Sequence, residues 1–325
     1  MKRILITGAN GFVGKALAAR LLRDGQVGDP VGGDPVPFDR LTLVDIGFDA
    51  PSDDPRVRQV AGSIADSGVL AEALAEGADG VFHLASIPGG AAEANFELGL
   101  DVNLRATIDL FERLRRQPVP ARLVFTSTIA VYGSPLPALV DDHSPLRPAL
   151  SYGAQKLAGE ILLQDYGRRG WIDGRILRLP GIVARPPAPS GAPSGLLSAF
   201  MSDLFWKLAA GEPVTCPVSE GAVAWWMSVG GCVDNLLHAA RLAPERAARR
   251  RDHTLPVLRL TIADLVDGLA AAFGEDRRGL VTYAPDPKLE AMFGAFPPLD
   301  ASASEAAGFH HDGSVAALIR NAMAR

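Results

Sequence analysis

Cysteine is scarce in this chain, long apolar runs are absent and there is no excess of positive charge. Only Cys216 and Cys232 occur in 325 residues, too few for a disulfide framework or a cysteine-rich metal site. No apolar stretch reaches the ~18 residues that a membrane span needs. The N-terminus enters an apolar strand pattern at once, which leaves no room for a signal peptide. These absences predict a cytoplasmic protein in a reducing compartment, with no bound metal and no membrane partner.

The charge balance argues against nucleic acid as the main partner. The formal net charge is -5 and the pI is about 5.7, whereas a nucleic-acid-binding surface needs a basic face. Two basic clusters, at 113–116 and 246–251, fall near expected helix ends, where arginine complements the helix dipole. With 48% apolar residues the chain can bury a substantial core, as one large domain or as one domain with a smaller lobe.

The first residues of the chain are typical of a dinucleotide-binding turn. An apolar run at 3–7 predicts a buried strand, and the pattern at 15–24 predicts a helix. Between them, Gly8 allows a tight turn, Gly11 lets the backbone approach a pyrophosphate, and Gly14 lets helix and strand pack closely. The alternative, an ordinary glycine-rich loop, is disfavoured because the triplet directly follows an N-terminal strand.

Strands and helices alternate along the first half of the chain. Further strands are expected at 41–44, 57–61, 81–84, 123–125 and 175–179, and helices at 66–75, at 91–116 as one or two segments, and at 151–169 with Ser151 as the cap. This alternation predicts an α/β fold with a doubly wound parallel Rossmann sheet over 1–179. A smaller C-terminal substrate-binding lobe is expected over 180–325, possibly interleaved with the sheet.

The second half has a different texture. Helices are expected at 196–210, 229–242, 261–273 and 314–323, with a strand at 280–283. Two segments rich in Gly and Pro, at 25–39 and 185–195, are expected to be loops, and the second could order over a ligand.

Asp45 and His83 each allow a functional and a structural interpretation. Asp45 ends the second strand, where an acid can accept both ribose hydroxyls and repel a 2′-phosphate, so NAD is favoured over NADP. The alternative for Asp45 is a turn residue at the end of a strand. His83 lies within a strand, and a hydrogen-bonded core histidine is favoured there over a catalytic one. A small-residue loop at 85–90 follows that strand, where ligands bind in open parallel sheets.

Tyr152 and Lys156 are the strongest candidates for catalysis. They lie one helical turn apart, so their side chains share a face. An ammonium group beside a phenol stabilises the phenolate, which makes Tyr152 a credible general base for an alcohol. A surface pair is the alternative, which the preceding Rossmann half and the Thr126-Ser127-Thr128 cluster disfavour.

Five motifs, GANGFVG, HLAS, VNLRAT, LVFTSTIAVYG and SYGAQK, resemble in order and spacing the extended short-chain dehydrogenase/reductase superfamily, which includes nucleotide-sugar epimerases and dehydratases. The resemblance implies that Tyr152 is the catalytic base and that Lys156 also holds the nicotinamide ribose. It implies that Thr128 orients the substrate hydroxyl, with Ser127 as the next candidate. Asn103 matches a position that supports the active site and the cofactor loop.

The same resemblance implies the residues around an NAD cofactor and a small-molecule substrate. Many members carry an Asp that contacts adenine where this chain has Ser63, whose hydroxyl can still hydrogen-bond there. Members dimerise through helices that correspond to 91–116 and 151–169, so a homodimer is expected. The residues implied for NAD are Gly8, Asn10, Gly11, Phe12, Val13, Gly14, Asp45, Ser63, Ile64, Leu84, Ala85, Ser86, Asn103, Tyr152, Lys156, Leu179, Pro180 and Ile182. Those implied for the substrate are Ser86, Ile87, Pro88, Thr128, Arg185 and Trp225.

Within the superfamily, the segments at 83–103, 151–186 and 308–320 are similar to the D-erythronate dehydrogenase branch, which oxidises the 2-hydroxyl of a four-carbon sugar acid with NAD. In nucleotide-sugar enzymes, an Asn that contacts the diphosphate stands where this chain has Gly181. Basic residues of the branch are replaced here by Ala222-Val-Ala before Trp225 and Trp226, which leaves Arg185 as the candidate partner of a substrate carboxylate. The two tryptophans are either core residues or a wall that favours a less polar substrate.

The sequence therefore predicts an NAD-dependent dehydrogenase that oxidises a secondary alcohol, with the 2-hydroxyl of a small sugar acid as the favoured substrate. Three alternatives stay open at this point. They are a nucleotide-sugar epimerase or dehydratase, a dehydrogenase of less polar or aromatic alcohols, and an NAD-binding sensor without catalysis. A sensor has no need of a tyrosine, a lysine and a threonine hydroxyl in this combination, which argues against it.

Overall fold

The computed structural model describes residues 1–27, 36–187 and 197–324. Most of both predicted loops, and the first residue of the helix expected at 196–210, lie outside the described residues. The chain divides into two compact units. The first unit comprises 1–131, 148–178 and 233–253, and the second comprises 132–147, 179–232 and 254–325. The end of the first unit's second segment lies next to the boundary expected at 179, and a third segment at 233–253 returns to the first unit.

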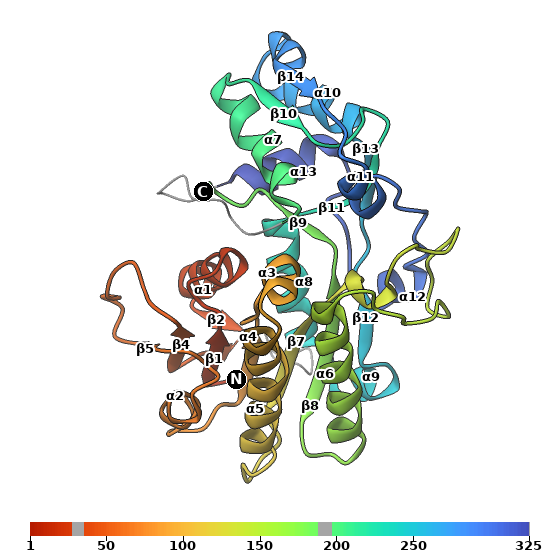
Figure 1. The fold of residues 1–325 in the computed structure, drawn as a ribbon. Helices are drawn as coiled ribbons and strands as arrows, with labels where there is room; N and C mark the ends of the chain where they lie inside the picture. Colours follow the sequence, from red (N-terminus) through yellow and green to blue (C-terminus); the bar gives the residue numbers. More distant parts are fainter. Residues whose placement is uncertain (28–35, 188–196, 325) are drawn as a thin grey trace. The chain divides into compact units, whose positions relative to one another are not determined.

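The first unit is built on a seven-stranded sheet in the order β12-β8-β7-β6-β1-β4-β5 (Figure 1). The central strand β1 (Arg3–Thr7) pairs in parallel with β4 (Arg40–Asp45) on one side and β6 (Gly80–His83) on the other. Strand β5 (Val57–Ala61) lies outside β4, and β7 (Arg122–Thr128), β8 (Asp173–Leu179) and β12 (Asp252–Thr254) follow beyond β6. Sequence order reverses direction at β1, so the predicted doubly wound α/β sheet is confirmed.

Helices pack against both faces of this sheet. Helix α1 (Phe12–Asp24) is joined to α8 (Val229–Arg241) by a 2.8 Å ion pair between Arg20 and Asp234. Figure 1 shows α5 (Ala106–Leu114) and α6 (Ser151–Arg168) side by side. The shorter helices of this unit are α2 (Ser67–Ala73) and α9 (Pro244–Arg249).

Two expectations about these helices need correction. The segment at 91–116 is broken into α3 (Gly89–Ala94), α4 (Phe96–Leu100), a π-helical turn (Asp101–Arg105) and α5. Asn95 ends α3 with a non-helical backbone, and its side chain accepts a hydrogen bond from the amide of Leu98 to start α4. Ser151 does not cap α6, because Leu150 is the N-cap and the amide of Ser151 donates to Glu93 instead.

The core of the first unit lies between the sheet and the face formed by the π-helical turn, α5 and α6. Its buried apolar residues include Leu5, Val81, Phe111, Phe125, Leu163 and Ile176. Phe111 and Phe125 meet edge to face, with ring centroids 6.2 Å apart. Burial of such side chains contributes about 1.5–3 kcal/mol each, which makes this interior the main support of α6.

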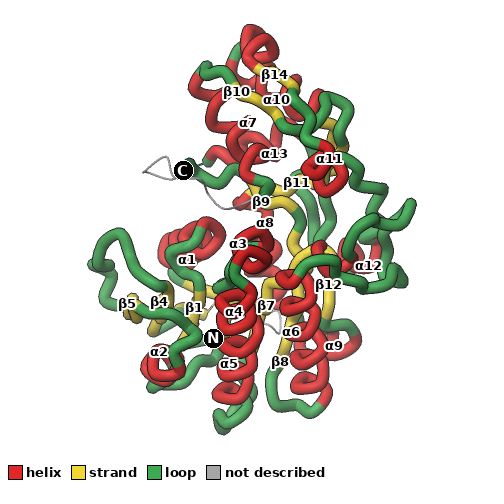
Figure 2. Tube along the Cα trace, in the orientation of Figure 1, coloured by secondary structure: helices red, strands yellow, loops and turns green. Residues whose placement is uncertain are grey.

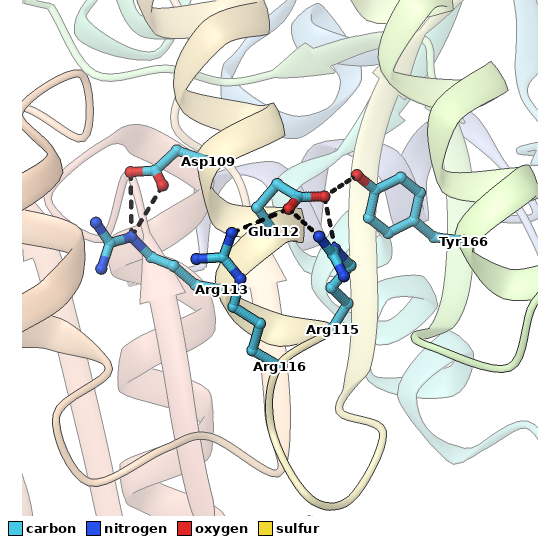
Figure 3. Close-up of polar contacts among 6 residues, drawn as sticks. All are labelled: Asp109, Glu112, Arg113, Arg115, Arg116 and Tyr166. Atoms are coloured by element: carbon cyan, nitrogen blue, oxygen red, sulfur yellow. Dashed lines mark hydrogen bonds and ion pairs between the residues drawn. The ribbon is translucent and has the colours of Figure 1, made fainter.

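A surface cluster joins the C-terminal parts of α5 and α6 (Figure 3). We call it the Glu112 cluster. Glu112 accepts two hydrogen bonds from Arg115, at 2.7 and 2.6 Å, one from Arg116, and one from the hydroxyl of Tyr166 on α6. Asp109 pairs with Arg113 beside it at 3.1 Å. Arg115 also lies over the ring of Trp171, so this basic segment is ion-paired surface.

The second unit has two small sheets and its own helices (Figure 2). Strand β11 (Val223–Ser228) pairs with β13 (Leu258–Thr261) and β9 (Gly181–Val183), and β10 (Val214–Cys216) pairs with β14 (Val281–Tyr283). Its helices are α7 (Ala199–Ala210), α10 (Ile262–Phe273), α11 (Pro287–Phe293), α12 (Ser302–Ala306) and α13 (Val315–Met323). Buried side chains from α7, α10, α13 and β11 form its core.

None of the helices described here is both long and apolar enough to cross a membrane. Among the residues with a described position, no three or more His, Cys, Asp or Glu side chains are grouped to hold a metal ion. Cys216 and Cys232 are both buried and unpaired.

Candidate active site

The glycine turn after β1 is packed as tightly as the sequence predicts. Gly8 has a φ of 70°, and a Cβ there would lie 2.7 Å from the backbone nitrogen of Ala85. A Cβ on Gly14 would collide with the carbonyl oxygen of Gly8. Helix α1 begins after Gly11, which offers no side chain to cap it, so the first turn can present backbone N–H groups to an anion.

Asp45 is fixed at the end of β4 by two backbone amides. One carboxylate oxygen accepts a hydrogen bond from the amide of Asn10 at 2.8 Å, and the other accepts from the amide of Ile46 at 2.7 Å. Asp49 lies nearby and pairs with Lys15 at 2.6 Å. The carboxylate of Asp45 is therefore tied to the glycine turn, as an acid that reads a ribose beside that turn needs to be.

His83 is a core residue, as favoured from the sequence. It is fully buried, and its two ring nitrogens lie 2.7 Å from the hydroxyl of Thr7 and 2.9 Å from that of Thr107. Thr107 donates its own proton to the carbonyl of Asn103, so Nε2 of His83 carries the hydrogen and Nδ1 accepts from Thr7. Burial, aided by the charge of Lys156, lowers the pKa of His83 to about 3, so the ring stays neutral.

Asn103 holds the loop after β6. Its side chain accepts from the amide of Ile87 at 2.7 Å and donates to the carbonyl of the same residue at 3.0 Å. It also donates to Gln155 on α6 at 2.8 Å. The π-helical turn points this fully buried amide inward. Asn103 is thus a support of the loop that carries Leu84, Ala85, Ser86, Ile87 and Pro88, all of them partly exposed.

Three hydroxyl groups meet at the N-terminal end of α6. Burial raises the pKa of the Tyr152 phenol above its ordinary value, and hydrogen bonds with the hydroxyls of Ser86 and Thr128 oppose that rise. Ser86 comes from the loop after β6 and Thr128 from the end of β7. The structure therefore brings together three of the residues expected around the substrate hydroxyl.

Lys156 is a buried cation without a hydrogen-bond partner among the described residues. Its side chain is 1% exposed, and its Nζ lies 4.9 Å from the ring centroid of Phe125 and 6.0 Å from that of Tyr152. Burial lowers the pKa of Lys156 to about 7, and the charge of Glu160 opposes this effect. An unpaired buried ammonium is costly, which indicates that a ligand completes its hydrogen bonding.

Ser127 has a different neighbourhood from Thr128. It is 2% exposed, and its hydroxyl donates to the carboxylate of Glu160. Glu160 is also held by the guanidinium of Arg178, with contacts of 2.7 to 3.2 Å, and Arg178 reaches Asp252 at 3.0 Å. We call these four residues the Glu160 network. Neither Glu160 nor Arg178 is among the site residues predicted from the sequence, although the i, i+4 spacing from Lys156 to Glu160 is a readable signal.

The described residues fit NAD. The glycine turn leaves its backbone bare at Gly8, Gly11 and Gly14, and Asp45 stands at its edge. The unpaired ammonium of Lys156 needs polar partners such as ribose hydroxyls. Ser63, expected near adenine, accepts a hydrogen bond from the amide of Ala65, and Ile64 is buried behind it. Phe12 and Val13 open α1.

Five of the expected residues belong to the second unit. Leu179, Pro180 and Ile182 lie at and after the end of β8. Arg185 is exposed, and its backbone is held by the hydroxyl of Ser202 and the indole N–H of Trp206. Trp225 is 1% exposed and its indole donates to the carbonyl of Pro297, which supports the core alternative left open from the sequence. Trp226 is wholly buried in the core of this unit.

Gly181 has close neighbours that a side chain would have to displace. A Cβ there would lie 2.8 Å from the terminal methyl of Met201 and 3.2 Å from the carbonyl oxygen of Trp225. An asparagine at this position would therefore have to displace its neighbours within the second unit.

Comparison with known proteins agrees with this geometry. The model of the "NAD dependent epimerase/dehydratase family" matches residues 4–246. A D-erythronate dehydrogenase of Cupriavidus necator is 40% identical over 98% of this chain and 96% of its own length, and one of Haemophilus influenzae is 31% identical over 98% of both. A solved nucleoside-diphosphate-sugar epimerase of Agrobacterium tumefaciens is 33% identical, with a TM-score of 0.87 over 98% of this chain and 92% of that one. The chain therefore belongs to the NAD dependent epimerase/dehydratase family, and its cofactor is NAD.

Proposed function

We propose that this protein is a dehydrogenase that oxidises the 2-hydroxyl of a small sugar acid of the D-erythronate type. The observation that carries the proposal is the meeting of Tyr152, Ser86 and Thr128 beside the unpaired ammonium of Lys156. The near full-length similarity to two D-erythronate dehydrogenases supports the substrate class. An alcohol hydroxyl placed among these groups has a proton acceptor, an orienting hydroxyl and a cation within one site.

Each residue has a distinct task in the proposed reaction. NAD, when bound, supplies the hydride acceptor. Tyr152, as the phenolate, accepts the proton of the substrate hydroxyl, and Thr128 orients that hydroxyl by hydrogen bonding. The charge of Lys156 stabilises the phenolate, while its Nζ has free donors for the ribose of the cofactor. Ser127, committed to Glu160, fixes the end of β7.

The test is NADH formation by the purified protein over a substrate panel. The panel holds D-erythronate, L-threonate, longer aldonates, hexuronates and apolar secondary alcohols, each with NAD and with NADP. Turnover of erythronate with NAD is expected to exceed that of every apolar alcohol. Turnover confined to apolar alcohols would overturn the sugar-acid assignment and leave only the dehydrogenase chemistry.

We further propose that Arg185 binds the carboxylate of the substrate. Its side chain is exposed while its backbone is fixed on both sides, so the guanidinium stands on a rigid base. A charge-assisted bond of this kind contributes about 1.5–3 kcal/mol, so an Arg185→Met variant should raise KM for the acid roughly 10- to 150-fold with kcat little changed. Arg278→Met, which removes a surface arginine paired with Asp267, is the matched control. An equal KM in Arg185→Met and wild type would refute this role.

A nucleotide-sugar epimerase is the second candidate, favoured by the 33% identity to a structure described as such an enzyme. It predicts NAD that copurifies with the protein and no net release of NADH. Gly181 argues against it, because a glycine stands where those enzymes carry a diphosphate-binding Asn, and a side chain there would have to displace the methyl of Met201. Conversion of a UDP-hexose to its epimer, without NADH, would favour this candidate over the dehydrogenase.

We also propose a cytoplasmic homodimer that pairs through α4, α5 and α6. Two free buried cysteines suit a reducing compartment. Phe96, Leu98 and Ile161 are 51%, 44% and 61% exposed, and α4 packs beside α6, so these two helices offer exposed apolar side chains to a partner. Ile161→Asp should shift the protein from dimer to monomer in light scattering. Val119→Asp, at a site 72% exposed beyond α5, is the control and should leave the dimer intact.

A further inference from the structure

We propose that Glu160 is a positioning residue of the dehydrogenase site: one buried carboxylate fixes the Ser127 hydroxyl and keeps the Lys156 ammonium charged. The inference rests on the proposed function in that it assumes oxidation of a secondary alcohol with Lys156 as a cation. Glu160 itself reaches neither the substrate hydroxyl nor the cofactor in this account, and it acts through its two neighbours.

Glu160 is placed close enough to Lys156 on α6 for its charge to act on the ammonium. The two residues lie one turn apart on α6, and each is at most 1% exposed. Beneath Lys156 lies the ring of Phe125, which gives a weak cation–π contact and no hydrogen bond. A buried ammonium in such a place loses its proton easily unless an anion stands nearby, and Glu160 is the anion whose charge acts on it.

The other described side chains on the strands and helix packed around Lys156 add no second anion beside it. On β6, His83 is neutral because burial lowers its pKa, and its ring nitrogens bond to two threonine hydroxyls. Strand β7 contributes Phe125 and Ser127, which carry no charge, and on α6 the only other titratable neighbour of Lys156 is Tyr152. Arg178 on β8 pairs through Nη2 with both Glu160, at 2.7 Å, and Asp252 on β12, at 3.0 Å, so one negative charge remains among these three groups. Glu160 therefore sets the local sign of charge among the described residues.

Hydrogen bonds from two side chains hold the carboxylate of Glu160 in one orientation. Its two oxygens are held by Nε and Nη2 of Arg178, and the hydroxyl of Ser127 donates to one of them. The proton of Ser127 is thereby committed, which leaves the Thr128 hydroxyl to serve Tyr152 and the substrate. This explains why two adjacent hydroxyls at the end of β7 have different roles.

The direct test is to titrate Lys156 in the protein without substrate. The chain has only five lysines, Lys2, Lys15, Lys156, Lys207 and Lys288, so selective ¹³C labelling gives a readable NMR spectrum in which Lys156→Met assigns the signal. In wild type the midpoint should lie near pH 7. In Glu160→Gln it should fall by about one unit or more, because a nearby opposite charge has been removed.

Matched variants separate this role from a structural one. Asp252→Asn removes the other carboxylate that pairs with Arg178 and should leave the midpoint of the Lys156 titration unchanged. Glu160→Asp retains the charge but retracts it, and should lower the midpoint less than Glu160→Gln does. This second variant carries the test if Glu160→Gln does not fold. A lowered thermal stability with an unchanged midpoint, in any folded Glu160 variant, would overturn the inference.

Kinetics give an independent reading with whichever alcohol the wild type oxidises. In Glu160→Gln the alkaline limb of the kcat/KM profile, which reports the enzyme free of substrate, should move to lower pH by the shift that NMR reports. Above that limb, kcat/KM should fall tenfold for each unit of that shift. Ser127→Ala should cost far less in kcat than Thr128→Ala, and equal losses would contradict the assignment of the two hydroxyls. Because the NMR titration needs no substrate, failure of the erythronate assay would leave this test intact.

Discussion

Two parts of α6, one buried and one exposed, use the same hydrogen-bonding pattern. In the buried part, Glu160 accepts from Ser127 and binds Arg178; in the exposed part, Tyr166 donates to Glu112, which binds Arg115. The side chains of Arg178 and Glu160 are 5% and 1% exposed, whereas those of Arg115 and Glu112 are 34% and 26% exposed. The buried carboxylate of Glu160 can therefore affect the charge of Lys156 strongly, whereas the exposed carboxylate of Glu112 only links α5 and α6.

The largest effect is expected on kcat, at the proposed base Tyr152 in the first turn of α6. Tyr152→Phe removes the proton acceptor without changing the ring, so kcat should fall by about 10³-fold or more, while the protein folds and binds NAD as before. Stopped-time assays and NAD titration by fluorescence check the two halves of this statement. Turnover within tenfold of wild type would show that another group is the base.

The second effect is on stability and concerns the buried pair. Arg178→Ala leaves the carboxylate of Glu160 uncompensated in the interior, which should reduce the free energy of unfolding by about 3–5 kcal/mol. Urea unfolding measures it. Arg115→Ala is the matched variant on the exposed side and should cost no more than about 1 kcal/mol. Equal losses of unfolding free energy in the two variants would show that burial does not distinguish the two ion pairs.

A smaller effect, with a sign set by pH, is expected in the Glu112 cluster. Hydrogen bonds from Arg115 and then Tyr166 lower the pKa of Glu112 from 4.5 to about 2. Because the folded-state pKa is depressed, the stabilisation is present above pH 4.5 and is lost as the pH falls toward 2. Solvent screening keeps it near 1 kcal/mol. Glu112→Gln should therefore be destabilised in urea at pH 7 and match wild type near pH 2.

The smallest effect is expected at the end of the helix. Arg168 is 70% exposed and pairs with Asp165 three residues before it. Arg168→Ala should change the free energy of unfolding by no more than about 0.5 kcal/mol, and 0.5 M salt should remove the difference. A loss of unfolding free energy above about 1 kcal/mol would contradict the expectation that exposed ion pairs on α6 contribute little to stability.

These contrasts also mark what the sequence could predict. Tyr152 and Lys156 were found because both lie within one turn of one helix, and the glycine turn because its residues are contiguous. Arg178 and Asp252 were not, because they reach Glu160 from strands far along the chain, and the Asp252 strand is three residues without an apolar run. Pairing of that kind is decided by topology, which local patterns do not encode.

Two local errors have local causes. Ser151 looked like a helix cap, but Leu150 has an extended backbone, with φ of −127° and ψ of 152°, and takes that position. The helix expected at 91–116 gave no sign of its π-helical turn, because one extra residue per turn leaves the apolar spacing almost unchanged. In the second unit, β9 and β13 have three and four residues and fall below the length at which alternation can be read.

The return of the chain to the first sheet has a consequence for biosynthesis. When a ribosome has made residues 1–179, β8 has been synthesised, but β12 has not. Arg175 and Arg178 still lack the carbonyl of Leu242 and the carboxylate of Asp252. The nascent sheet thus carries an open strand edge and two arginines awaiting burial until residue 253 has emerged. Because β12 is the last strand of this sheet to be synthesised, the sheet of the first unit can be completed only after the segment at 233–253 has been made.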